Sequence, residues 1–331
     1  YLEKSLASEL SANVIDLCPV GALTSRPYAF TARPWELNKT ESIDVMDAVG
    51  SNVRVDARGA QVMRVLPRLN EDVNEEWISD KTRYAIDGLR RQRLDRPYAR
   101  GRDGKLQPIS WDEALQTVAG KLRKAKANRV AAIAGNQCDA ESMFALKSLM
   151  ARLGSPHLDC RQDGAKIGGA RSGYLFNSTI AGIDDADALL IVGSNPRLEA
   201  AVLNARIRRN WLITQMPIGV IGQDADLTYA TQWLGDDATV LHELLAGKHK
   251  FAAKLKKAKR PMIILGMGAL RRADGAAILG RSRQLAEAYG VVTDKWNGFN
   301  ILHNAAGRVA GLDMGFVPAR GGMAVAVIAA A

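Results

Sequence analysis

Cysteine is scarce in this sequence, with three residues in 331 and no regular spacing between them. Three cysteines cannot form a disulfide framework, so we expect a reducing, intracellular compartment. No apolar stretch approaches the ~20 residues that a membrane-spanning helix needs, so we expect no direct membrane insertion. The first residues show no signal-peptide pattern. The sequence also lacks a Walker loop and a Gly-x-Ser-x-Gly nucleophile elbow, so neither signature supports a catalytic site.

The composition is that of a soluble globular protein with a core, at 47% hydrophobic and 24% charged residues. At ~150 residues per domain, the length predicts about two domains. The net charge is +10, and part of the excess lies in the segment 81–102. This segment has few aromatic residues and no nucleic-acid-binding motif. We therefore interpret it as a solvated or subunit-facing surface and expect no nucleic-acid partner.

The sequence divides into three regions. Residues 1–40 contain Cys18 and several prolines, and we expect them to be partly helical or loose. Residues 41–107 show alternating apolar and polar residues in short runs, which predicts a small antiparallel β subdomain. The strands expected there are 42–46, 52–56 and 61–67.

The third region, 108–331, predicts an α/β fold. Ser110 is expected to cap a helix, with Glu113 as its capping-box partner. Beyond it, continuous apolar runs alternate with amphipathic helices, which indicates a doubly wound, mostly parallel sheet. The expected strands are 130–135, 188–193, 218–222 and 262–266, and the expected helices are 141–153 and 198–209. The apolar run 323–331 is expected to begin a further buried strand.

Three strand ends, 135–139, 193–197 and 266–268, lie where open parallel sheets bind ligands. The first two could hold a phosphate or a nucleotide at a helix N-terminus. The third fails as a Rossmann fingerprint, because Arg271 occupies the third glycine position. We favour plain strand-to-helix turns at all three. The histidines are scattered and are not expected to bind a metal; they are His157, His242, His249 and His303.

Cys18 is followed by Pro19 and then by small and apolar residues, a pattern with which many iron–sulfur sites end. One cysteine cannot hold a cluster, which normally needs four. Cys138 and Cys160 lie far along the chain, and we interpret both as small buried thiols. Either Cys18 is also an ordinary buried thiol, or its partner ligands lie upstream of Tyr1. A first residue other than methionine favours the second interpretation.

The stretch from Asn13 to Leu37, with its Cys-Pro-Val-Gly-Ala-Leu motif, resembles the large iron–sulfur subunits (75 kDa type) of respiratory NADH:quinone oxidoreductase, complex I. The resemblance covers essentially the whole chain. It implies that Cys18 is the fourth ligand of a [4Fe–4S] cluster. The other three ligands would come from a Cys-x-x-Cys-x-x-Cys run upstream, so the chain would be a fragment without the main cluster domain.

The remainder resembles the molybdopterin oxidoreductases, with Trp111-Asp112-Glu113-Ala114-Leu115 and the run 187–196 as typical motifs. That family begins with cluster-binding cysteines. The residues at the matching positions here are Asp44, Asp47, Ser51 and Ser79. Because carboxylates and hydroxyls do not replace thiolates in a [4Fe–4S] site, the resemblance implies no cluster in this subdomain. The molybdenum ligand would fall within 161–165, where Asp163 is a weak candidate, so no molybdenum is expected.

The resemblance implies a subunit of a proton-translocating NADH:quinone oxidoreductase that relays electrons through iron–sulfur clusters and has no catalytic residue. Its α/β domain would be a non-catalytic scaffold, and the fragment alone would be inactive. Its partners would be other peripheral-arm subunits, including the NADH-oxidising flavoprotein, on the cytoplasmic face of a bacterial inner membrane or the mitochondrial matrix side. Two alternatives stay open: an active molybdopterin-dependent oxidoreductase, and a non-enzymatic nucleotide-binding α/β module.

Overall fold

The computed structural model describes residues 6–330 of the chain. The strands are β1 (Asn38–Ile43), β2 (Asn52–Arg58), β3 (Gln61–Pro67), β4 (Tyr98–Arg100), β5 (Leu106–Pro108), β6 (Ala132–Ile133), β7 (Leu158–Asp159), β8 (Ala188–Val192), β9 (Ile218–Ile221), β10 (Gln232–Gly235), β11 (Pro261–Gly266) and β12 (Phe299–Leu302).

The α-helices are α1 (Asn13–Leu17), α2 (Asp80–Tyr84), α3 (Trp111–Lys124), α4 (Ala140–Leu153), α5 (Pro196–Glu199), α6 (Ala201–Thr214), α7 (Thr239–Leu245), α8 (Lys250–Lys257), α9 (Met267–Leu270), α10 (Gly275–Ala288), α11 (Arg308–Asp313) and α12 (Val325–Ala330). Short 3₁₀ helices span Pro34–Glu36, Ala85–Leu89, Ala127–Arg129, Arg171–Gly173 and Ala181–Asp185. Within residues 6–330, no helix has both the length and the apolar character needed to cross a bilayer.

The small antiparallel sheet has the strand order β1-β2-β3, as the sequence predicts. Its core consists of Val53, Val65 and Ile78. The prediction of a first strand over 42–46 was wrong, because β1 ends at Ile43. Just beyond it, the carboxylate of Asp44 accepts a hydrogen bond from the backbone N of Met46 at 3.1 Å. Local side-chain-to-backbone bonds of this kind compete with the strand ladder and end it.

The larger sheet has the order β10-β9-β8-β11-β12, and every neighbouring pair is parallel. The predicted strands 188–193, 218–222 and 262–266 are confirmed in it as β8, β9 and β11. The predicted strand 130–135 is reduced to β6, which pairs with β7 in a separate two-stranded parallel sheet. The parallel, doubly wound character of the fold is confirmed.

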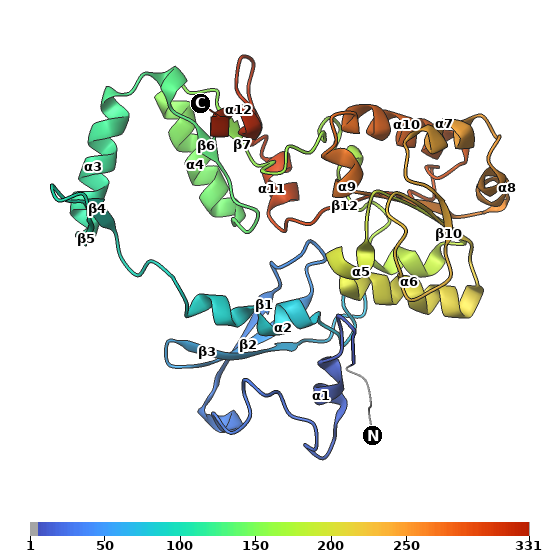
Figure 1. Cartoon of the computed structure of the whole chain (residues 1–331), viewed down its shortest axis with the longest axis horizontal. Helices are drawn as coiled ribbons and strands as arrows, with labels where there is room; N and C mark the ends of the chain where they lie inside the picture. The colour runs from blue at the N-terminus through green and yellow to red at the C-terminus, as the bar shows by residue number, and fades with distance from the viewer. Residues whose placement is uncertain (1–5, 331) are drawn as a thin grey trace.

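Side chains of β8 alternate between the two faces of the larger sheet. Leu190 and Val192 belong to the hydrophobic core shared with α7, α8 and α10, whereas Leu189 and Ile191 belong to the core shared with α6. Figure 1 shows the helices on the two sides of this sheet. A strand buried on both faces needs a continuous apolar run, which is why this pattern predicted a parallel sheet.

The expected helices form, with small shifts. The carboxylate of Glu113 accepts a hydrogen bond from the backbone N of Ser110 at 2.9 Å, so the predicted capping box of α3 is confirmed. The helix expected over 141–153 is α4. The helix expected over 198–209 is split into α5 and α6 at Ala200, whose φ of −152° and ψ of 67° are not helical.

The C-terminal run does not begin a strand, so that prediction was wrong. Residues Val325–Ala330 form the helix α12. The run is interspersed with alanine, the residue with the highest intrinsic helix propensity, and this outweighs the β preference of its valines.

Substitution of Gly193, the residue that follows β8, should destabilise the sheet. Its φ is +58°, and an alanine Cβ there would lie 2.5 Å from the backbone N of Ala269. We expect Gly193→Ala to lower the free energy of unfolding by roughly 2–4 kcal/mol, measured by urea denaturation. The control is Gly280→Ala in α10, where no atom lies within 4 Å of the added Cβ. Equal losses in the two variants would contradict this explanation.

Candidate metal centre

Cys18 directly follows the short helix α1 and is partly exposed. The nearby backbone N–H groups of the loop, that of Leu23 foremost and then those of Val20, Ala22 and Gly21, hold the pKa of Cys18 below its ordinary value. Gly21 has a φ of +65°, a conformation that glycine adopts without strain and that turns the loop back over the sulfur. The loop therefore favours a thiolate, the form of cysteine that binds iron.

Amide donors around a sulfur are also a feature of iron–sulfur sites, where they tune the potential of the cluster. The residues present thus fit one ligand of such a cluster. Among residues 6–330, however, no group of three or more His, Cys, Asp or Glu side chains is arranged to hold a metal ion. Within this part of the chain, Cys18 therefore does not belong to a group of three or more ligands.

The two other thiols differ from Cys18. Cys160 is buried, as predicted, and burial raises its pKa to about 11. Cys138 is partly exposed, so its interpretation as a buried thiol was wrong. Its sulfur accepts a hydrogen bond from the backbone N of Gly135 at 3.2 Å, within the turn that follows β6.

Apolar side chains surround Cys18 in the sequence and remain exposed. They are Val14, Leu17, Val20, Leu23, Phe30 and Trp35. Val20, two residues from the cysteine, is 81% exposed. A concentration of large exposed apolar side chains marks a surface that another protein segment covers.

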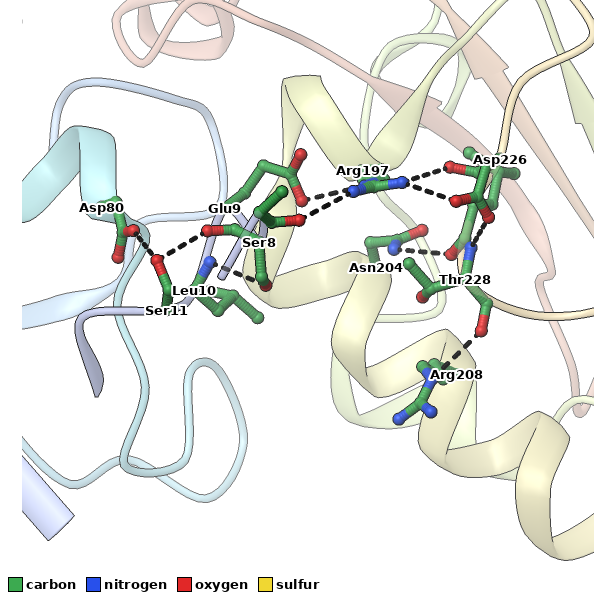
Figure 2. A network of polar contacts seen from close by, with 12 residues as sticks. Ser8, Glu9, Leu10, Ser11, Asp80, Arg197, Asn204, Arg208, Asp226 and Thr228 are labelled. Atoms are coloured by element: carbon green, nitrogen blue, oxygen red, sulfur yellow. Dashed lines mark hydrogen bonds and ion pairs between the residues drawn. The ribbon is translucent and has the colours of Figure 1, made fainter. Parts of the chain in front are cut away.

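The segment before α1 bridges the small subdomain and the larger sheet (Figure 2). Asp80 of α2 accepts hydrogen bonds from the hydroxyl of Ser11 at 2.7 Å and the backbone N of Ala12 at 2.9 Å. On the other side, the guanidinium of Arg197 in α5 lies 2.9 Å from the carboxylate of Glu9 and 2.9 Å from that of Asp226. One stretch of chain is thus tied to both folded parts.

The four positions that match cluster-binding cysteines lie close to one another and are buried. They are Asp44, Asp47, Ser51 and Ser79. The hydroxyl of Thr82 donates to Asp44 at 2.9 Å, and the hydroxyl of Ser79 caps α2 by accepting from the backbone N of Thr82 at 3.1 Å. The side-chain oxygens of Asp44 and Ser79 are thus engaged within the protein. The set does not fit a [4Fe–4S] cluster, whose iron atoms need thiolates.

Asp47 is the least well compensated member of this set. It is 3% exposed, and burial, together with the nearby charge of Asp44, raises its pKa to about 6. The backbone N of Val49 donates to its carboxylate at 3.0 Å and offsets part of this effect.

Asp163, the weak candidate for a molybdenum ligand, is paired instead with a buried arginine. Its carboxylate lies 3.0 Å from a guanidinium nitrogen of Arg308, which is 1% exposed. His303 is also buried; its Nε2 lies 2.6 Å from the carbonyl of Tyr174, and burial lowers its pKa to about 4. A carboxylate neutralised by arginine is a poor metal ligand, so the residues here do not fit a molybdenum site.

The structure brings two of the three strand ends together. Residues from 193–197 and 266–268 line one cavity of about 350 Å³ at the carboxyl ends of β8 and β11, together with Arg271 and Arg272. The turn 135–139 lines a different cavity, of about 600 Å³.

Comparison with known proteins decides the family. The family model "Molybdopterin oxidoreductase" matches residues 93–330. The chain belongs to the molybdopterin oxidoreductase family. Residues 37–87 match the model "NADH-ubiquinone oxidoreductase NDSU1/NuoG-like, 4Fe-4S domain", and residues 1–24 match "NADH-quinone oxidoreductase subunit 3, ferredoxin-like domain". The solved structure of acetylene hydratase from Pelobacter acetylenicus shares this fold, with a TM-score of 0.56 and 14% identity over 77% of this chain and 44% of that one.

Related sequences confirm the resemblance to the large complex I subunit. The chain is 51% identical to the mitochondrial NADH dehydrogenase [ubiquinone] iron-sulfur protein 1 of Solanum tuberosum, over 96% of this chain and 43% of that protein. It is 51% identical to an NADH-quinone oxidoreductase subunit of Rickettsia conorii, over 96% and 47%. The 78 kDa mitochondrial subunit of Neurospora crassa is 52% identical, over 96% and 43%. The chain spans less than half the length of these relatives.

Replacement of Asp47 should change how stability depends on pH. Because folding raises the pKa of Asp47 to about 6, the folded protein binds this proton more tightly, and the stability that the proton contributes is lost as pH rises from about 4 to 6. We expect Asp47→Asn to raise the free energy of unfolding by up to about 3 kcal/mol at pH 8 and hardly at all at pH 4. The exposed Asp224→Asn is the control, and a pH-independent effect of Asp47→Asn would contradict this assignment.

The thiols should differ in reactivity in the order of their pKa shifts. We expect iodoacetamide at about pH 7.5 to alkylate Cys18 well before Cys160, because alkylation requires the thiolate. Peptide mass spectrometry over time measures both rates in the same sample. Labelling of Cys160 at the rate of Cys18 would show that the loop does not favour the thiolate.

Proposed function

We propose that this chain is part of the large iron–sulfur subunit of a proton-translocating NADH:quinone oxidoreductase, and that Cys18 is one of four ligands of a [4Fe–4S] cluster. The observation that carries the proposal is the loop after Cys18, whose backbone N–H groups lower the pKa of the thiol, in a stretch that matches a ferredoxin-like domain model over residues 1–24. When bound, such a cluster accepts and passes on one electron at a time. The chain's own contribution is to hold a thiolate and to place amide donors against it.

The other three ligands come from outside the described residues in this proposal. Cys160 is excluded by burial, and Cys138 lies in the turn after β6. The exposed apolar side chains around Cys18 support a cover that brings the remaining thiolates. The match of residues 1–24 to a ferredoxin-like domain model agrees with this arrangement.

We propose three domains: residues 1–40 as the end of the iron–sulfur domain, 41–107 as a vestigial cluster domain, and 108–331 as a molybdopterin-oxidoreductase-like domain. The last serves as a non-catalytic scaffold, because Asp163 is neutralised by Arg308 and the stretch 161–165 offers no cysteine or histidine. This argues against the active molybdopterin-dependent enzyme. A nucleotide-binding module without a cluster is the other candidate, supported by the cavity at the carboxyl ends of β8 and β11.

The partners in this proposal are other peripheral-arm subunits of complex I, including the NADH-oxidising flavoprotein. The chain would lie on the cytoplasmic face of a bacterial inner membrane or on the matrix side in mitochondria. The uninterrupted exposed stretch 87–96, which holds Arg90, Arg91 and Arg93, is a suitable subunit-facing surface. We propose no nucleic-acid partner for it.

The test is replacement of each cysteine in the assembled enzyme. We expect Cys18→Ala to remove one [4Fe–4S] signal from the low-temperature EPR spectrum of the reduced enzyme, because one of four iron–thiolate bonds is lost. Cys138→Ala and Cys160→Ala are the matched controls and should leave all signals in place. A full set of signals in Cys18→Ala would refute the proposal and favour the nucleotide-binding module.

A further inference from the structure

We propose that Arg83 is a positioning residue for Cys18: through α1, the vestigial cluster domain fixes the ligand of a cluster that it does not itself contain. This inference rests on the proposed function, since it concerns the same site. It also corrects one expectation, because Arg83 lies in the basic segment 81–102 that we interpreted as surface, yet is 5% exposed.

Arg83 contacts α1 at two points. One terminal nitrogen of its guanidinium lies 2.5 Å from the carboxylate of Asp16 and donates to the side-chain oxygen of Asn13 at 3.2 Å. Asn13 also donates to the carbonyl of Ile78 at 2.8 Å and accepts from its backbone N at 3.2 Å. All of these bonds join α1 to residues of the small subdomain.

The helix needs such external bonds. It has five residues, and a helix this short is not stable alone. It begins without a side-chain cap, and its outward side chains Val14 and Leu17 are exposed. Its orientation is therefore set by Arg83 and Asn13, and Cys18 follows its last residue.

The chain beyond Cys18 is held by a second arginine of the same subdomain. The guanidinium of Arg64 lies 4.4 Å from the ring centroid of Tyr28, in a cation–π contact. Arg64 is in turn fixed by Asp56, whose carboxylate is fully buried and 2.8 Å away. The loop 18–23 thus lies between two anchored points of the chain: Arg83 holds α1 before it, and Arg64 holds Tyr28 after it.

The short helix α2 links these two anchors to the positions that match cluster-binding cysteines. Thr82 makes hydrogen bonds with Asp44 and Ser79, and the next residue, Arg83, reaches α1. The side-chain oxygens of Asp44 and Ser79 thus hold α2 in place, and the side chain of Arg83 extends from α2 to α1.

The experiment measures hydrogen–deuterium exchange of the backbone amides of residues 14–23 in this chain, by peptide mass spectrometry. We expect Arg83→Gln to free α1 and the loop that follows it, so that these amides exchange about threefold faster. Asp16→Asn breaks the same ion pair and should act similarly. The double variant should add little to either single one, because both remove one contact. Arg83→Lys keeps the charge and should recover part of the protection.

The matched control is Arg206→Gln. Arg206 is 7% exposed and paired with Asp184 at 3.0 Å, but it lies in α6 and makes no contact with α1 or the loop 18–23 among the hydrogen bonds and ion pairs of residues 6–330. It should lower stability and leave the exchange of residues 14–23 unchanged. If Arg83→Gln and Asp16→Asn lower only the unfolding midpoint, with wild-type exchange of residues 14–23, Arg83 has a purely structural role and the inference is wrong. If Arg83→Gln does not fold, Asp16→Asn decides alone.

The assembled enzyme separates this inference from the function on which it rests. If both hold, Cys18→Ala removes one EPR signal and Arg83→Gln shifts the midpoint potential of that same signal. Loss of the signal in Cys18→Ala with an unchanged potential in Arg83→Gln would refute the inference alone. A full set of signals in Cys18→Ala would refute the function, whatever Arg83→Gln does.

Discussion

The ion pair between Arg83 and Asp16 is the contact on which the place of Cys18 depends. A helix of five residues contributes little stability of its own, so α1 takes its orientation from what it binds. A buried guanidinium is costly unless an opposite charge compensates it, and Asp16 supplies that charge. The energetic cost of burying Arg83 thus enforces the geometry: the arginine is stable where it is only if α1 lies against it.

A second constraint is chemical. Oxygen at Asp44, Asp47, Ser51 and Ser79 cannot hold the cluster that thiolates would hold, yet these residues stay buried and close together. The side chains of Asp44 and Ser79 hydrogen-bond to Thr82, and the carboxylate of Asp47 accepts from the backbone N of Val49 while burial raises its pKa to about 6. Hydrogen bonds thus hold this part of the subdomain together and fix α2, whose residue Arg83 contacts α1.

Local patterns predicted the local structure. Apolar runs gave β8, β9 and β11, and Ser110 with Glu113 gave the start of α3, because each signal lies within a few neighbouring residues. The errors came where two local preferences compete, as at Asp44 and in the alanine-containing C-terminal run. Cys18 could be proposed as a ligand from the sequence because its motif is contiguous. Arg83 could not be found in this way, because it meets Asp16 across 67 residues, and no spacing rule links positions so far apart.

The glycines at the strand ends show why a surviving motif is weak evidence for a ligand. An alanine Cβ at Gly268 would lie 2.6 Å from the carbonyl oxygen of Gly193, and Gly193 itself abuts Ala269. The ends of β8 and β11 thus approach so closely that glycine is required by packing, with or without a ligand in the cavity beside them. Packing alone therefore accounts for the glycines at these strand ends, whereas a metal site has to be argued from the ligand residues themselves.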